Sequence, residues 1–183
     1  MPDELKIIHY PDPRLKRISA TVEVFDDQLA ALASKMFELM RASRGVGLAA
    51  PQIGKGIRLF IMNHTQQPGD DRTYVNPELL DATGEDEAEE GCLSLPGINT
   101  NVVRAKTVTL RAQDLQGNPV ELTETGYVAR IWQLEIDHLN GVLITDRVGP
   151  GTKLMLRKTL KELEDQYAAD HPAPQRAKAR ARR

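Results

Sequence analysis

Apolar residues recur at helical spacing in two long segments of the chain. The first runs from a cap at Asp26 or Asp27 to about Ser43, with apolar positions at Leu29, Leu32, Met36, Leu39 and Met40. The second covers residues 153–169 and ends at His171 and Pro172, with a stripe of Leu156, Leu160, Leu163 and Tyr167. This period is typical of helices that bury one face. We therefore predict a helix near each end of the chain, and we expect the second stripe to dock on the rest of the domain.

A third helix is predicted over residues 127–139, which contain neither Gly nor Pro. Ile131, Leu134 and His138 fall on one face of it. Strand patterns appear at 57–62, at 102–111 and at 120–123, and the turn at 114–119 makes the last two a hairpin. Residues 5–9 suit a short strand or an extended arm, whereas 45–56 and 63–73 are expected to be loops, and 97–101 show no sustained apolar alternation.

This order of elements predicts an α+β fold in which antiparallel strands pack around the helix at 127–139. The length of 183 residues suits one domain, which we place at residues 1–170, followed by a C-terminal tail at 171–183. The composition is 40% hydrophobic and 27% charged, as in a globular protein with a core of its own. No internal repeat is present.

Charge and hydropathy exclude several classes of function. No run approaches the roughly 18 apolar residues of a membrane span, and residues 1–6 hold no apolar segment of signal-peptide length. We therefore expect a cytoplasmic protein without a membrane segment. The net charge of −2 gives no reason to expect DNA binding. The tail is locally basic, with five cationic side chains, so it is either solvated or an electrostatic contact for ribosomal RNA: Arg176, Lys178, Arg180, Arg182 and Arg183.

Three motifs carry candidate chemistry, and each has an ordinary structural explanation when taken alone. Glu135 and His138 form E-x-x-H, which lacks the first histidine of the metal-binding H-E-x-x-H pattern and also occurs on plain surface helices. The single cysteine, Cys92, excludes an internal disulfide and is a buried hydrophobe, a nucleophile or a metal ligand. The segment 45–52 is a Gly-rich loop with an amide donor at Gln52, but its spacing does not match a phosphate-binding loop.

Taken together, the motifs resemble the signatures of the peptide deformylase family. G-x-G-L-A-A-x-Q stands at residues 45–52, E-G-C-L-S at 90–94, and Q-H-E-x-D-H at 133–138 with Leu134 as the one mismatch. Further similarities extend over most of the chain and include Tyr10-Pro11-Asp12-Pro13-Arg14-Leu15, Asn76-Pro77, Arg104-Ala105, Asp114-x-x-Gly117 and His138-Leu139-Asn140-Gly141-Val142-Leu143.

The resemblance implies a role for each matched residue. Cys92 and His138 would be metal ligands, Glu135 would move the proton, and Gln52 with the backbone N–H of Leu93 would stabilise the oxyanion. Glu90 would pair with Arg104 behind them. By family position and helix spacing, the pocket for a methionine side chain would be formed by Val46, Gly47, Tyr127, Ile131 and Leu134.

The resemblance also implies a cofactor and partners. The family's usual metal is Fe²⁺, with Zn²⁺, Ni²⁺ or Co²⁺ as substitutes, and a bound metal lowers the pKa of its water from about 15.7 toward 7. The reaction removes the formyl group from the N-terminal formylmethionine of nascent proteins. The ribosome is then a second expected partner, through the C-terminal helix and the basic tail.

Leu134 departs from this pattern because leucine has no lone pair, and the other histidines (His9, His64 and His171) are distant in sequence. Metal binding should therefore be weakened or lost. The first hypothesis is a deformylase impaired at this position. The second is a non-catalytic homologue that binds formyl-peptides or the ribosome. A generic metalloprotease has no use for Cys92 or the Gly-rich loop.

Overall fold

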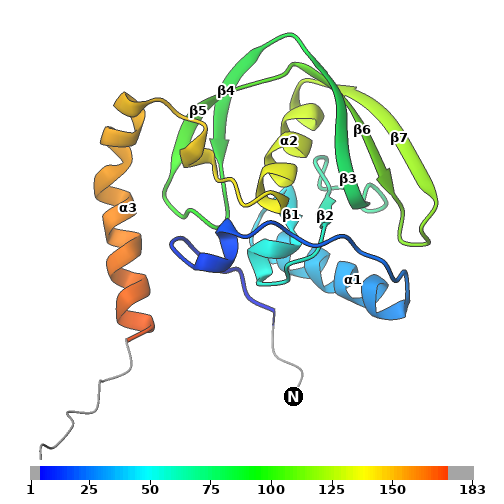
Figure 1. The fold of residues 1–183 in the computed structure, drawn as a ribbon, viewed down its shortest axis with the longest axis horizontal. Helices are drawn as coiled ribbons and strands as arrows, with labels where there is room; N and C mark the ends of the chain where they lie inside the picture. The colour runs from blue at the N-terminus through cyan, green and yellow to red at the C-terminus, as the bar shows by residue number, and fades with distance from the viewer. Residues whose placement is uncertain (1–4, 173–183) are drawn as a thin grey trace, which may run out of the picture.

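The computed structural model describes residues 5–172, and Figure 1 shows them as three helices arranged around antiparallel strands. The helices are α1 (Asp27–Ala42), α2 (Tyr127–Leu139) and α3 (Pro150–Asp170). Short 3₁₀ turns lie at η1 (Pro13–Lys16), η2 (Ala50–Ile53) and η3 (Ile144–Asp146). The strands are β1 (Gly47–Ala49), β2 (Leu59–Met62), β3 (Arg72–Thr83), β4 (Asp86–Gly91), β5 (Asn99–Arg104), β6 (Thr107–Gln113) and β7 (Pro119–Thr125).

The strands form two antiparallel sheets. One has the order β1-β2-β3-β6-β7, and the other pairs β4 with β5. Side chains on one face of the larger sheet therefore meet in fixed pairs, such as Phe60 with Tyr74 and Leu110 with Leu122. In Figure 1, α2 lies in the centre, with β4 and β5 on one side and β3, β6 and β7 on the other.

Helix α2 is buried on most of its surface. Its apolar face packs on the larger sheet, where Trp132 meets Tyr74 edge to face with ring centroids 5.6 Å apart. Its other buried residues include ionisable ones, Arg130, Glu135, Asp137 and His138. Buried charged groups need partners or a function, so α2 is the element on which candidate chemistry should be sought.

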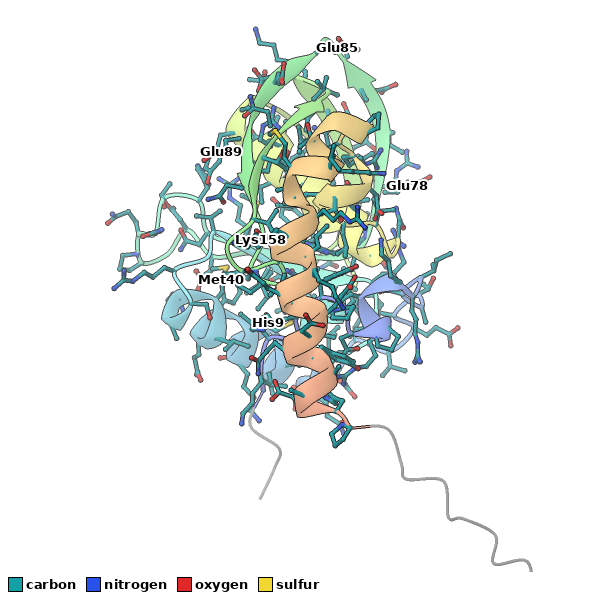
Figure 2. All side chains as sticks on the ribbon, turned by 90° about the vertical axis from the view of Figure 1, so that its left-hand side faces the viewer. His9, Met40, Glu78, Glu85, Glu89 and Lys158 are labelled. Carbon is teal, nitrogen blue, oxygen red and sulfur yellow. The ribbon has the colours of Figure 1, made fainter. Side chains whose placement is uncertain are left out.

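The other two helices cover the domain from outside. Asp26 caps α1 by accepting a hydrogen bond from the Leu29 N–H at 3.0 Å, and Met36 and Met40 are buried beneath the helix. Helix α3 has no fully buried residue, but its stripe of Leu156, Leu160 and Leu163 packs on a cluster that contains Leu15, Leu95 and Leu143. Figure 2 views α3 from its outer side, where Lys158 is exposed.

The predicted α+β class and all three helices are confirmed, and α2 has the predicted bounds. The hairpin across 114–119 is confirmed as β6 and β7. Residues 5–9 are an extended arm rather than a strand, held by a 2.8 Å hydrogen bond from the Ile8 N–H to the Gln52 carbonyl. No helix within residues 5–172 is long and apolar enough to cross a membrane.

Four parts of the strand prediction were wrong. The segment 45–56 holds β1 and η2, and the loop at 63–73 ends at Arg72, where the unpredicted β3 begins. The single strand predicted at 102–111 is the end of β5 and most of β6, which belong to different sheets. β4 was missed because its sequence is mainly acidic. It exposes Glu87 and Glu89, buries Glu90 and is held by pairing with β5, a tertiary contact that strand propensity does not report.

Asn76 explains why a strand as long as β3 was missed. It lies in the left-handed region (φ 51°) at an irregularity in the β3–β6 pairing, next to Pro77, so local propensity argues against a strand. At this irregularity the side-chain amide of Asn76 makes hydrogen bonds in place of the regular backbone bonds between strands. Oδ1 accepts from the Val22 N–H, while Nδ2 donates to the Val22 carbonyl and to Gln113 Oε1, all within 2.9 Å.

We predict that Asn76→Ala lowers the free energy of unfolding by about 2 kcal/mol, because three hydrogen bonds are lost and alanine disfavours a positive φ. Urea unfolding followed by circular dichroism measures this. Asn101→Ala is the matched control, since Asn101 is exposed on β5 and should change stability by less than about 0.5 kcal/mol. Equal effects of the two substitutions would contradict the role given to the Asn76 amide.

Candidate active site

A cavity of about 420 Å³ lies between β1, the segment after β4 and α2. Successive turns of α2 present Tyr127, Ile131, Leu134, Glu135 and His138 to it, as the spacing of i, i+4 and i+7 requires. The residues that the sequence singled out and that line this one cavity are Val46, Gly47, Gln52, Cys92, Leu93, Tyr127, Ile131, Leu134, Glu135 and His138. Three parts of the chain, far apart in sequence, therefore meet here.

Cys92 and His138 are direct neighbours in this cavity. The Cys92 Sγ lies 3.2 Å from His138 Nε2. Gln52 lies beside them because its Oε1 accepts a 2.8 Å hydrogen bond from the Ala49 N–H, which turns Nε2 toward the sulfur at 3.5 Å and toward Ser94 Oγ at 3.3 Å. The amide nitrogen is thus a fixed donor that points at the Cys92–His138 pair.

Burial favours the neutral form of each ionisable group at this point. Desolvation raises the pKa of Cys92 to about 12, and hydrogen bonding from the Ser94 backbone only partly offsets it. Desolvation lowers the pKa of His138 to about 4, against the opposing effect of Asp137. Desolvation, helped by the nearby charge of Glu90, raises the pKa of Glu135 to about 8. The neutral imidazole of His138 retains a lone pair, which a metal ligand requires.

Three buried polar atoms of α2 find no hydrogen-bond partner within residues 5–172. They are Nε1 of Trp132 in the core, Oε2 of Glu135 and Nδ1 of His138. An unpaired buried polar atom typically costs about 1–3 kcal/mol, so folded proteins rarely keep one without a function. The last two belong to residues that line the cavity, which marks it as a binding or catalytic site rather than a packing defect.

A buried ionic network supports the cavity from behind. Glu90 accepts two 2.9 Å hydrogen bonds from Arg104 and one of 2.7 Å from Arg130. Arg104 also donates to Asp137, the residue before His138. Glu90 and Arg104 were expected to pair, and they do so. Arg130 and Asp137 were not anticipated, although Asp137 is part of the motif around His138 and could have been found there.

Gly47 allows β1 to approach α2 closely. A Cβ atom at this position would lie 2.4 Å from Glu135 Oε1 and 3.1 Å from Ile131 Cγ2. No real Cβ contact is so short, so either the strand or the carboxylate would have to move. At Gly45 a Cβ would lie 2.8 Å from Leu93 Cδ1. The two glycines of the loop therefore set the width of the cavity.

Leu134 occupies the part of the cavity where a further donor would be needed. It packs, together with Cys92, against the cluster that contains Leu95, Ile98 and Leu143. Within residues 5–172, no group of three or more His, Cys, Asp or Glu side chains is arranged to hold a metal ion. The donors present are one sulfur and one imidazole nitrogen, so they do not fit a metal held by a thiolate and two imidazoles.

Comparison with known proteins now places the chain. The family model of polypeptide deformylases matches residues 4–153, which contain every wall of the cavity. The chain belongs to this family. It is 42% identical over 162 residues to a peptide deformylase of Chromobacterium violaceum, a match that covers 88% of this chain and 97% of that protein. It is 37% identical over 184 residues to the chloroplastic/mitochondrial peptide deformylase 1B of Arabidopsis thaliana, covering 98% of this chain and 67% of the relative.

Solved deformylase structures share the fold. A peptide deformylase from Legionella pneumophila superimposes with a TM-score of 0.84 at 43% identity, covering 91% of this chain and 98% of the other. A plant peptide deformylase superimposes with a TM-score of 0.90 at 36% identity, covering 96% and 98%. Deformylases are metal-dependent hydrolases, so the incomplete donor set beside Leu134 is the feature of this chain that needs a functional explanation.

We predict that Gly47→Ala displaces Glu135 and lowers the free energy of unfolding by about 1–3 kcal/mol, the usual range for overpacking. Thermal unfolding and a crystal structure of the variant would measure both effects. Gly56→Ala is the matched control, because a Cβ at Gly56 meets nothing within 4 Å. If Gly47→Ala were as stable as Gly56→Ala with Glu135 unmoved, the close approach of β1 to α2 would not matter.

Proposed function

We propose that this deformylase binds N-formylmethionyl peptides in the cavity beside α2 and that Leu134 impairs their hydrolysis. The observation that carries the proposal is the pairing of Cys92 with His138 at 3.2 Å in a cavity where, among the described residues, no third His, Cys, Asp or Glu is grouped with them to hold a metal ion. The walls and the hydrogen-bonding groups of the site are retained, while the position that would complete a metal site bears two methyl groups.

Binding is supported by the chemistry of the cavity walls. Val46, Ile131 and Leu134 give an apolar surface suited to a methionine side chain, and Tyr127 borders it with half of its surface exposed. The Nε2 group of Gln52, with the backbone N–H of Leu93, is proposed to donate hydrogen bonds to the formyl oxygen. A donor of this kind is typically worth roughly 3–4 kcal/mol of barrier. Glu135 is proposed to carry the proton between the attacking water and the departing amine.

The cofactor expected from the family, Fe²⁺ or one of its substitutes Zn²⁺, Ni²⁺ and Co²⁺, does not fit this donor set. Two protein ligands bind a divalent ion more weakly than three, and the side chain of Leu134 has no lone pair with which to supply the third bond. We therefore derive no hydrolytic step through a metal for this chain. The residues that remain would bind and orient a formyl-peptide without activating water.

A second candidate function follows from the same cavity. A homologue that binds formyl-peptides or the ribosome without hydrolysing them needs the apolar walls and the Gln52 donor but not the third ligand. The intact hydrogen bond from Ala49 to Gln52 supports this alternative, because it keeps the donor in place independently of any metal. Peptide binding without turnover is the result that would favour it.

The cellular setting stays a prediction. Formylmethionyl peptides arise on nascent proteins, so we infer action in the cytoplasm, although one relative is named for chloroplasts and mitochondria. The ribosome is proposed as a partner through α3, whose outer side exposes Leu154 and Met155. The basic tail at 173–183 lies outside the described residues. The domain boundary at residue 170 likewise stays a prediction.

We predict that Leu134→His converts the chain into a protein that retains a stoichiometric metal after dialysis against a mild chelator. Deformylation of formyl-Met peptides should rise by at least about a hundredfold, because a three-donor site is restored. Atomic absorption and a peptide hydrolysis assay measure the two effects. The unaltered chain should lose its metal in the same dialysis.

Tyr127→His is the matched control. It adds an imidazole to the same cavity from the same face of α2, but two turns away from Leu134. It should gain neither metal nor activity. A tightly held metal in the unaltered chain would contradict the proposed impairment. A metal gained by Leu134→His without activity would show that function is lost elsewhere as well.

A further inference from the structure

A second cavity lies on the opposite side of α2 from the deformylase site. Its volume is about 770 Å³, against 420 Å³ for the site described above, and its lining is mainly polar. Gln133, Ile136, Asp137 and Asn140 of α2 face it, whereas Leu134, Glu135 and His138 face the first cavity. Figure 2 labels one residue from each region. Glu78 lines the second cavity, and Met40 lies next to Gly45 of the first; the two labels stand on opposite sides of α3.

The arginines of this cavity differ in how they are paired. Three arginines line it, Arg58, Arg104 and Arg147, against two carboxylates, Glu78 and Asp137. Asp137 is already shared between Arg104 and Arg147, and Arg104 also binds Glu90. Glu78 is exposed on β3 and makes no ion pair with Arg58 within the described part of the chain. Arg58 is therefore the one arginine lining the cavity that has no ion-pair partner among the described residues.

Arg58 binds only neutral groups. Its guanidinium donates to Asn140 Oδ1 at 2.9 Å and to the Pro77 carbonyl at 3.0 Å, and both acceptors are neutral. These bonds use two of the five N–H groups of an arginine. Burial lowers the pKa of Arg58, and the charge of Glu78 only partly restores it. A guanidinium remains charged in proteins, so a partly buried one without a direct ion pair favours binding of an anion.

We propose that this second cavity binds a small oxyanion, a carboxylate or phosphate group of a metabolite, with Arg58 as its principal ligand. Arginine presents paired N–H donors that match both groups in a bidentate geometry. Arg147, whose side chain is about half exposed (48%), can add a donor from the rim.

The position of Trp132 makes binding observable. It is the single tryptophan of the chain, and it is fully buried on α2 next to Gln133 of the cavity wall. A ligand that alters the packing of α2 against the sheet should change its fluorescence. Calorimetry measures the affinity whether or not the fluorescence responds.

The test titrates the full-length chain with inorganic phosphate and, separately, with succinate, each against sodium chloride at equal ionic strength. We expect saturable binding of at least one of the two probes. Phosphate alone would indicate a phosphorylated ligand, and succinate alone a carboxylate. Arg58→Gln should weaken that binding by about tenfold or more, as expected for the loss of a charge-assisted hydrogen bond.

Two further variants make the result specific. Arg111→Gln removes an equal charge from an exposed ion pair on β6, so it should bind the probe as the unaltered chain does. Glu78→Gln removes the opposing carboxylate and should tighten binding by about threefold. If neither probe binds, or if Arg58→Gln and Arg111→Gln bind equally, the cavity is not an oxyanion site. The Glu78 variant keeps the proposal testable even if Arg58→Gln fails to fold.

Discussion

Glu90 at the end of β4 accepts hydrogen bonds from Arg104 of β5 and Arg130 of α2, and Arg104 continues to Asp137 on the next turns of α2. These charges are buried, so removing one partner would leave another uncompensated at a cost of about 3–5 kcal/mol. The network thereby fixes the distance between the smaller sheet and α2. Cys92 follows β4 directly and His138 follows Asp137, so their 3.2 Å separation depends on it.

The same arrangement divides α2 by function. One face seals the hydrophobic core through Trp132, a second presents Glu135 and His138 to the deformylase cavity, and a third borders the arginine-lined cavity. Because a helix turns by 100° per residue, neighbouring residues such as Gln133 and Leu134 face different cavities. Leu134 thus changes one cavity without disturbing the core, which explains how the fold of the family is kept while its donor set is incomplete.

Much of this could be predicted from the sequence, and the parts that failed share a physical cause. The bounds of α2 follow from its period and from the absence of Gly and Pro, and the residues of the three motifs do line one cavity. The strands β3 and β4 were not predicted because tertiary contacts hold them. β3 depends on the amide of Asn76, and β4, whose sequence is mainly acidic, depends on pairing with β5. Local propensity measures neither contact. The burial of Arg130 could not be predicted, because a single arginine on a helix is usually solvated. Only the tertiary structure shows its contact with Glu90.

Titration of the unaltered, metal-free chain with Co²⁺, followed by its absorption spectrum, tests the central claim most directly. A Co²⁺ ion held tightly by a thiolate and imidazoles gives strong thiolate charge-transfer and tetrahedral bands that saturate at one ion per chain. If Cys92 and His138 are the only donors, these bands should stay weak, rise without saturating and vanish on desalting. Saturation at one equivalent, with bands that survive desalting, would show that the site holds its metal despite Leu134.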